Sequence, residues 1–293
     1  MADSFRSVES AWDIHVHADP SLFPRWGDAG ELVEVCETAS MEGVVLKSHH
    51  GSTVELAAHL DASSHLRVFG GVALNRFVGG LNPFAVESAL AIGAKIVWLP
   101  TLHASEHEDA CGQLGGFEFQ TGAVDRVPDE GLTITGEDGR LLPEVEEIVD
   151  ILDGSDVILA SGHVSVDEFR TLQEHVRGEG RDVNLLVNHA FFHTPQMTPA
   201  QIEELAGPRT WFEITYISVS EMAEAASPEQ VGEAIERVPD ARWIMATDSG
   251  QRGNPTSPEA LAEFGRLLAG VGVDDAQIRA MMVDEPRRVL GRN

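Results

Sequence analysis

The sequence predicts an α/β fold, and two observations carry this prediction. Short runs rich in valine and isoleucine recur along the 293 residues, at 12–17, 43–48, 67–75, 94–100, 156–163, 183–190, 210–216 and 242–250. Several are apolar without alternation, as expected of parallel strands that are covered on both faces. Segments with apolar residues at helical spacing separate most of these runs. Eight strands that alternate with helices form the pattern of a closed (β/α)8 barrel, the TIM barrel.

The helical segments follow the strands in order, at 29–41, 53–62, 83–92, 143–153, 165–177, 198–206, 220–237 and 257–269. Three of them carry a capping residue followed by proline at their start: Asn82-Pro83, Thr198-Pro199 and Ser257-Pro258. The final VDEPRRVLG predicts a short closing helix. An open, doubly wound sheet is the alternative, but such sheets usually have fewer strands, and no GxGxxG follows the first strand.

The stretch 101–142 interrupts this alternation, because it carries no helical pattern. Within it, GLTITGEDGRLLPE alternates and then turns at Asp138-Gly139, which predicts a β-hairpin insertion after the fourth strand. This is the face where barrel enzymes place their active sites. The insertion is therefore either a lid or pocket wall, or an inert excursion. No second domain is indicated, so residues 1–293 are expected to form a single barrel domain.

The chain is strongly acidic, with 48 acidic against 20 basic side chains and a formal net charge of −28. Such a surface repels nucleic acid and anionic membranes, so neither is expected as a partner. The two cysteines show no paired spacing, the N-terminus lacks a signal-peptide pattern, and no run approaches the length of a membrane span. We expect a soluble, cytoplasmic protein that acts on a small molecule. The oligomeric state stays open, a homo-oligomer included.

The acidity leads to a prediction about stability. Acidic residues are dispersed and only two lysines are present, a composition typical of proteins from salt-loving organisms, whose cytoplasm screens the self-repulsion. We therefore expect the melting temperature to rise between low and molar salt, because added ions screen repulsion within the folded chain. Scanning calorimetry across a salt series measures this. A melting temperature that does not move would contradict the interpretation.

Side chains that bind metals or move protons gather at the C-terminal ends of the predicted strands. His15 and His17 lie on the first strand, and residues i and i+2 of a strand share a face, so both imidazoles can face one ion. The later strand ends carry, in order, Lys47 and His49, Asn75 and Arg76, Thr101 and His103, His163, His189, and Asp248. In a closed barrel these ends meet at one mouth.

This ligand set predicts a metal site. A single histidine at a strand end is more often a structural residue, but several converging on one mouth indicate a common partner. Neutral imidazoles with a carboxylate suit one or two divalent ions. Zn²⁺ is favoured, and Mn²⁺ and Fe²⁺ are the alternatives.

The same residues, in the same order, resemble the amidohydrolase superfamily of metal-dependent hydrolases. The motifs are DIHVH on the first strand, SGHVS and VNHAFF on the fifth and sixth, ATDSG on the eighth, and a closing DEPRRVLG. The segment LNRFVGGLNPFAVESALAIGAKIVWLPT resembles an uncharacterised branch of small amidohydrolases. The resemblance implies that His15, His17 and Asp248 hold one ion and that His163 and His189 hold a second. It also implies that Asp248 is the catalytic base.

Two lysines bear on the number of ions. Two-metal members of the superfamily often carry a carboxylated lysine on the fourth strand, but Lys95 begins that strand and is expected to be structural. Lys47 ends the second strand, where some relatives place a bridging ligand. Burial and nearby metal charge favour its neutral amine, which takes up CO₂ to give a carbamate. The alternative is an ammonium group beside a one-metal site.

Candidate substrate contacts are fewer. Arg76 is either a clamp for an anionic substrate or a partner of the acidic surface. His49 and His103 are expected to line the pocket. Glu213 and Tyr216 lie on the seventh strand, with no sign of which face they take. The remaining histidines of helices and loops are expected to be solvated: His59, His65, His107 and His175.

These observations predict a metal-dependent hydrolase that uses a metal-activated hydroxide on a small amide, lactone or ester, anionic if Arg76 is the clamp. Phosphoester hydrolysis is a close variant. A one-metal lyase of the same superfamily, such as a decarboxylase, is the second class, and a barrel that binds a ligand without turnover is the third. Two ions per chain would favour hydrolysis, and one would leave the lyase open.

Overall fold

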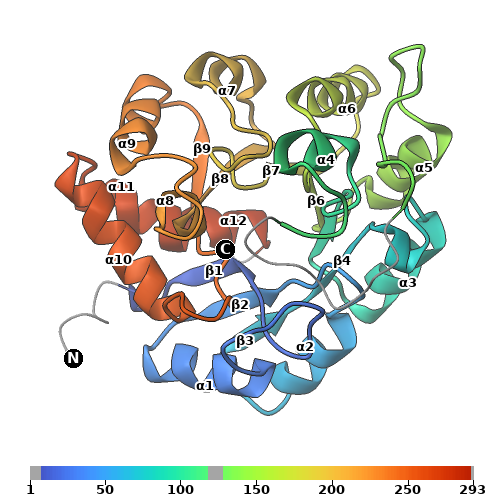
Figure 1. Ribbon diagram of the computed structural model, residues 1–293. Helices are drawn as coiled ribbons and strands as arrows, with labels where there is room; N and C mark the ends of the chain where they lie inside the picture. The colour runs from blue at the N-terminus through green and yellow to red at the C-terminus, as the bar shows by residue number, and fades with distance from the viewer. Residues whose placement is uncertain (1–7, 118–127, 292–293) are drawn as a thin grey trace.

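The computed structural model describes residues 8–117 and 128–291, and it shows parallel strands at the centre with helices around them (Figure 1). Among these residues, nine strands form a three-stranded sheet, ordered β1-β2-β3, and a six-stranded sheet, ordered β4 to β9. The strands are β1 (Trp12–Val16), β2 (Gly43–Leu46), β3 (Arg67–Phe69), β4 (Gly71–Ala73), β5 (Ile96–Trp98), β6 (Ile158–Ala160), β7 (Asn184–Val187), β8 (Thr210–Thr215) and β9 (Arg242–Ala246).

Two of these strands, β3 and β4, are the halves of one predicted strand, 67–75, which is interrupted at Gly70. β3 pairs with β2, whereas β4 pairs with β5, so this one run joins the two sheets. The pairing is close, because a Cβ at Gly71 would lie 2.0 Å from the carbonyl oxygen of Ile96. Only glycine fits there.

The first and last strands join on the other side. Val16 of β1 forms a parallel bridge with Ser249, just beyond β9. The amide of Asp248 donates to the carbonyl of His15 at 2.8 Å, and the amide of His17 donates to the carbonyl of Ser249 at 2.8 Å. The parallel α/β architecture predicted from the sequence is therefore confirmed, with eight strand positions around the centre.

Asp13 fastens this junction from within. Its buried carboxylate accepts from the amide and the hydroxyl of Thr247, at 3.1 and 2.5 Å, from the Ser257 hydroxyl at 2.6 Å, and from the His15 amide at 3.2 Å. Burial raises the pKa of Asp13 to about 6, although these hydrogen bonds act to lower it. One carboxylate thus ties β1 to β9 and to the following helix.

The helices lie on the outside of the strands, so that two layers of core form, one inside the ring of strands and one between strands and helices (Figure 1). They are α1 (Ala29–Thr38), α2 (Val54–Asp61), α3 (Pro83–Ile92), α4 (Ser105–Cys111), α5 (Pro143–Leu152), α6 (Val166–Gly178), α7 (Pro199–Leu205), α8 (Tyr216–Val219), α9 (Pro228–Arg237), α10 (Ser257–Gly270), α11 (Asp275–Arg279) and α12 (Glu285–Val289). A 3-10 turn (Arg76–Val78) follows β4, and a π-helical turn (Ala280–Asp284) precedes α12, the predicted closing helix.

Helix starts follow the capping rules with two corrections. Asn82 and Thr198 cap α3 and α7 as predicted. Thr256, not Ser257, caps α10, because the Ser257 hydroxyl is occupied by Asp13. The predicted helix 220–237 is also wrong in its first half, because Pro228 sets a new N-terminus and the preceding Ser227 caps it.

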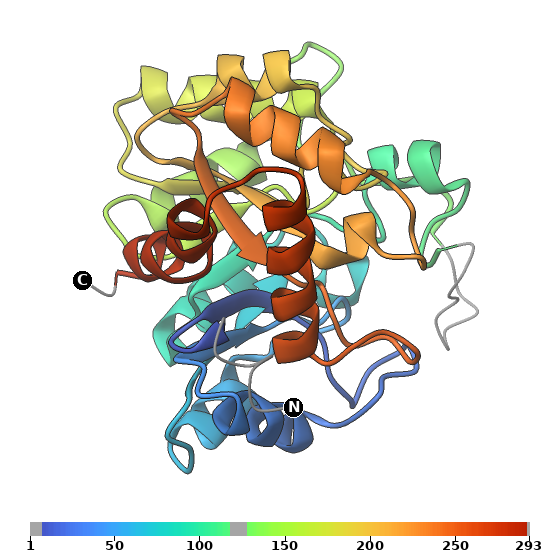
Figure 2. The ribbon, with the colours of Figure 1, turned by 90° about the vertical axis from the view of Figure 1, so that its left-hand side faces the viewer.

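The insertion after the fourth predicted strand contains a helix that the sequence did not indicate. α4 lies at the end of the barrel opposite to α12 (Figure 2). The predicted hairpin is present as a tight antiparallel contact, with a bridge between Thr135 and Leu141 and a hydrogen bond from the Gly136 amide to the Arg140 carbonyl at 2.8 Å. Residues 118–127 of the predicted insertion lie outside the described part of the chain.

Across residues 8–117 and 128–291, no helix has both the length and the apolar character needed to cross a bilayer.

Candidate metal centre

His15, His17 and Asp248 come together at the junction of β1 and β9. Nε2 of His17 lies 3.0 Å from Oδ1 of Asp248, and Nε2 of His15 lies 3.3 Å from the same oxygen. One ligand atom from each residue falls within 4.8 Å of the others. Gly250 makes this approach feasible, since a Cβ there would lie 2.3 Å from the carbonyl oxygen of His17. The three residues predicted to hold the first ion are thus brought together.

The hydrogen bonds of these imidazoles fix which nitrogen is free. Nδ1 of His15 lies 2.9 Å from the carboxylate of Glu213, and Nδ1 of His17 lies 2.9 Å from the carbonyl oxygen of Lys47. Both partners only accept, so each Nδ1 carries the proton and each Nε2 keeps its lone pair. Two lone pairs and a carboxylate oxygen therefore converge in a buried space, an arrangement that suits a divalent cation.

His163 and His189 follow the same rule. Nδ1 of His189 lies 2.8 Å from the carbonyl oxygen of Thr194, and Nδ1 of His163 lies 2.9 Å from Nδ1 of His107. Nε2 of His107 in turn lies 2.8 Å from the carbonyl oxygen of Gly116, so it holds that ring's only proton in the neutral state. Nδ1 of His107 must then accept from His163. In the neutral state, all four predicted histidine ligands therefore carry their lone pair on Nε2.

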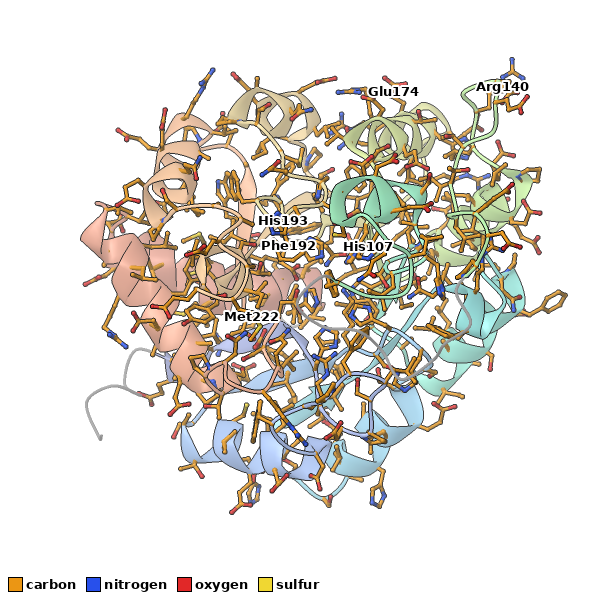
Figure 3. All side chains as sticks on the ribbon, viewed as in Figure 1. His107, Arg140, Glu174, Phe192, His193 and Met222 are labelled. Carbon is orange, nitrogen blue, oxygen red and sulfur yellow. The ribbon has the colours of Figure 1, made fainter. Side chains whose placement is uncertain are left out.

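His107 corrects the expectation that it is solvated, because it is fully buried. It lies on α4, and in the view of Figure 3 it falls towards the middle of the molecule, whereas Arg140 and Glu174 lie at the periphery. Its ring centroid lies 4.9 Å from that of His163. Burial lowers the pKa of His107 to about 4, which keeps the ring neutral and able to accept. A short helix of the insertion thus orients one predicted ligand.

Replacing His107 with phenylalanine should weaken metal binding through His163. Phenylalanine fills the space but cannot accept the Nδ1 proton, and losing such an orienting partner costs about 10- to 100-fold in metal affinity. Competition against a chelator measures the change, with the exposed His59→Phe as control. An unchanged metal affinity in the His107 variant would show that His163 needs no such partner.

Glu213 resolves the open question about the seventh predicted strand, because its side chain points into the barrel. Oε2 accepts from His15 at 2.9 Å, from the Asn188 side chain at 3.1 Å and from the His189 amide at 2.9 Å. Burial acts to raise the pKa of Glu213, but the charge and hydrogen bond of His15 and further charges nearby lower it to about 2. Oε1 has no hydrogen-bond partner among the described residues. An ionised, partly unsatisfied buried carboxylate also calls for a cation.

Asp248 is ionised at neutral pH. Burial acts to raise its pKa, but His15 and then His17 hold that pKa well below the usual value. Its backbone has φ 52°, and that of His189 has φ 29°, both in the left-handed region that is costly for residues with a side chain. Strained backbone of this kind is concentrated at functional sites.

Lys47 lies inside the predicted metal centre. Its Nζ is 3.0 Å from Nε2 of His15 and 5.5 Å from the centre of the Trp98 ring. Burial lowers the pKa of Lys47 to about 8, so the neutral amine is accessible near neutral pH. Lys95 behaves as expected of a structural residue, because it pairs with Asp156 at the other end of its strand. The carbamate at Lys47 stays a prediction.

A narrow cavity opens onto these residues. Its space is about 20 Å³, the room taken by one water molecule or ion. Its lining includes His17, His49, His163 and Asp248, together with Phe23, Arg25, Phe117, Phe192, Ile217 and Gln251. The lining therefore combines predicted ligands and further polar residues with apolar side chains.

Of the three predicted substrate contacts, one lines the cavity and two do not. His49 lines the cavity, with Nδ1 2.9 Å from the Thr101 hydroxyl. The Arg76 side chain is exposed and donates to the carbonyl of Glu130 at 2.8 Å, and its amide donates to Nδ1 of His103 at 3.1 Å. Neither Arg76 nor His103 is among the residues that line the cavity, and their contact with substrate stays a prediction.

Sequence reasoning missed Arg25, which follows the first strand in the segment SLFPRWGD. It is 3% exposed and lines the cavity. Burial lowers the pKa of Arg25 to about 10, while Asp248 and Asp19 act to raise it. An arginine in a loop with two prolines carries no pattern of its own, so only the folded position reveals it.

Comparison with known proteins agrees with this geometry. Residues 10–213 match the model of a family of unknown function, DUF6282, and no curated protein matches the chain. An amidohydrolase from Pseudomonas aeruginosa has a similar structure, with a TM-score of 0.62 and 14% identity over 99% of this chain and 97% of that one.

Two further solved structures have the same architecture. The 2,6-dihydroxybenzoate decarboxylase from Rhizobium gives a TM-score of 0.57 at 11% identity, over 96% of this chain and 98% of that one. An enamidase, described as a member of the amidohydrolase superfamily, gives 0.58 at 13% identity, over 97% of this chain and 68% of that one. The predicted TIM barrel is thereby confirmed. The chain belongs to the DUF6282 family, and its fold is that of amidohydrolase-superfamily enzymes.

Proposed function

We propose that the protein is a metal-dependent hydrolase that cleaves an amide, lactone or ester bond of a small molecule. One observation carries the proposal. Four buried imidazoles, those of His15, His17, His163 and His189, each have Nδ1 engaged, so that the neutral ring carries its lone pair on Nε2. Nε2 of His15 and of His17 lie beside the ionised Asp248. A merely structural set of histidines has no need for four lone pairs in one buried place.

The residues then take distinct roles. The donor set suits Zn²⁺. When bound, such an ion would lower the pKa of a water molecule and polarise the bond to be cleaved. Asp248 directs Oδ1 towards the two imidazoles, and 15% of its side chain remains exposed. Its carboxylate accepts the proton of the attacking water and returns it to the leaving group. Glu213 holds the tautomer of His15, and the surrounding phenylalanines exclude bulk water.

A one-metal decarboxylase is the second candidate. Within the described residues, one cluster alone, His15 with His17 and Asp248, has ligand atoms close enough to hold an ion as they stand. The decarboxylase from Rhizobium has a similar structure. In this alternative Lys47 remains an uncarboxylated amine and no second ion binds. Phosphoester hydrolysis remains a variant of the first proposal, since it needs the same activated water.

Metal counting together with a substrate screen tests the proposal. The purified protein is loaded with Zn²⁺, its ions per chain are counted, and it is assayed against amides, lactones, esters, phosphoesters and aromatic carboxylic acids. Two ions, and turnover of the first three classes that a chelator removes, are expected. One ion with release of CO₂ from the acids would replace the hydrolase by the lyase. Full activity after complete metal removal would overturn both.

A further inference from the structure

Arg25 is a buried cation for which the described part of the chain supplies no paired anion. Its side chain lines the cavity, and no carboxylate among residues 8–117 and 128–291 lies within 4.0 Å of it. Burying a guanidinium without a partner is costly, so proteins keep such groups where a ligand completes them.

The Arg25 guanidinium is held at Nε, and its two terminal nitrogens are available to a ligand. Nε donates to the Ser21 hydroxyl at 3.2 Å, and the group lies 5.7 Å from the centre of the Phe23 ring. The main chain is fixed as well, because Arg25 bridges Gln251 and its carbonyl accepts from Arg252 at 3.0 Å. Within the described residues, neither terminal nitrogen donates a hydrogen bond. Two parallel donors on a rigid support match the geometry of a carboxylate.

The rest of the cavity fits an apolar group. Phe23, Phe192 and Ile217 supply apolar surface to its lining. Since the open space is about 20 Å³, a substrate enters only when some of these side chains rotate. Each phenylalanine side chain has two rotatable bonds about which it can turn to open this space.

We propose that Arg25 binds the carboxylate of the substrate, and that the protein acts on small carboxylates with an apolar body. The proposal rests on the proposed function only in naming this ligand a substrate. It also places the anion clamp on the loop after β1 instead of at Arg76.

Calorimetric titration of the zinc-loaded protein tests this inference with two matched pairs, acetate against acetamide and benzoate against benzamide. The wild type should bind each carboxylate more tightly than its amide. Arg25→Gln should weaken benzoate binding by about 10- to 100-fold, the contribution of hydrogen bonds between charged groups, and leave benzamide unchanged. Arg25→Lys keeps the positive charge but loses the paired donors of the guanidinium. Its benzoate affinity should therefore lie between those of the wild type and Arg25→Gln. Arg76→Gln tests the other candidate clamp and should leave benzoate affinity unchanged, and Arg140→Gln, at an exposed position, is the matched control.

Each other result overturns the clamp. A preference for carboxylates that survives in Arg25→Gln comes from the metal, and one that disappears in Arg76→Gln assigns the clamp to Arg76. Equal binding of carboxylates and amides to the wild type removes the anion site altogether. If Arg25→Gln fails to fold, as judged by its melting temperature and zinc content, an Arg25→Lys variant with wild-type benzoate affinity overturns the proposal.

Turnover is measured separately, so that the two proposals fail in different ways. Arg25-dependent binding of benzoate in a protein that hydrolyses nothing would keep the clamp and remove the hydrolase. Hydrolysis of neutral esters that is unaffected by Arg25→Gln would keep the hydrolase and remove the clamp.

Discussion

Asp248→Asn is expected to lose most turnover, by about 10²- to 10⁴-fold, while the protein keeps its fold and much of its metal. The asparagine side chain keeps an oxygen that can face His15 and His17, so the ligand geometry survives. It cannot accept a proton, however, and the carboxylate it replaces is held ionised by those two imidazoles. The loss should therefore fall on kcat more than on KM.

Steady-state kinetics, with zinc content measured on the same samples, checks this expectation once a substrate is found. Asp240→Asn is the matched control, because Asp240 is exposed and precedes the same strand that Asp248 follows. It should behave as the wild type. Wild-type turnover in Asp248→Asn would contradict the assignment of the base, and a complete loss of zinc would mean that Asp248 acts chiefly as a ligand.

Glu213→Gln is expected to damage both stability and metal binding. Three donors, from His15, Asn188 and the His189 amide, converge on one buried oxygen, and all three would lose a charged acceptor. We expect a loss of about 3 kcal/mol in the free energy of unfolding. Because His15 and His189 both depend on this carboxylate for their orientation, metal affinity should fall by about 10- to 100-fold.

Urea denaturation of the metal-free protein measures the loss of stability alone. Competition against a chelator measures the loss of metal affinity. Glu236→Gln, on the exposed face of α9, serves as the control and should be neutral in both. If Glu213→Gln unfolds at the wild-type urea concentration and binds zinc with wild-type affinity, the carboxylate does not support the site.

The sequence was sufficient for the parts of this protein that follow from local pattern. Apolar runs of strand length place the strands, and histidines at their ends indicate which side chains gather at one mouth, because a parallel barrel brings all such ends together. For this reason alone, His15 could be paired with Asp248 from the sequence. The break at Gly70 was not predictable, since it depends on which neighbour each half of the strand pairs with.

Contacts that depend on how loops and strands pack could not be predicted in this way. β8 is buried on both faces, so no alternation tells whether Glu213 points inward. α4 has seven residues, three of them acidic, and no apolar residues at helical spacing, so it resembled a solvated loop. Its one buried side chain is His107. Arg25 meets Gln251 only through a bridge between the loops that follow β1 and β9.

The junction of β1 and β9 joins an early and a late part of the chain, so the cluster at this junction can form only late in synthesis. Asp13 and Thr247 are 234 positions apart, yet they meet directly beside the ligands of the first ion. At ordinary rates of synthesis, the histidines of β1 leave the ribosome roughly 10 to 50 s before Asp248 exists. A nascent chain therefore carries an open pair of imidazoles with no carboxylate to complete them. A fragment that ends before β9 lacks Asp248, and so it lacks one member of the cluster formed by His15, His17 and Asp248.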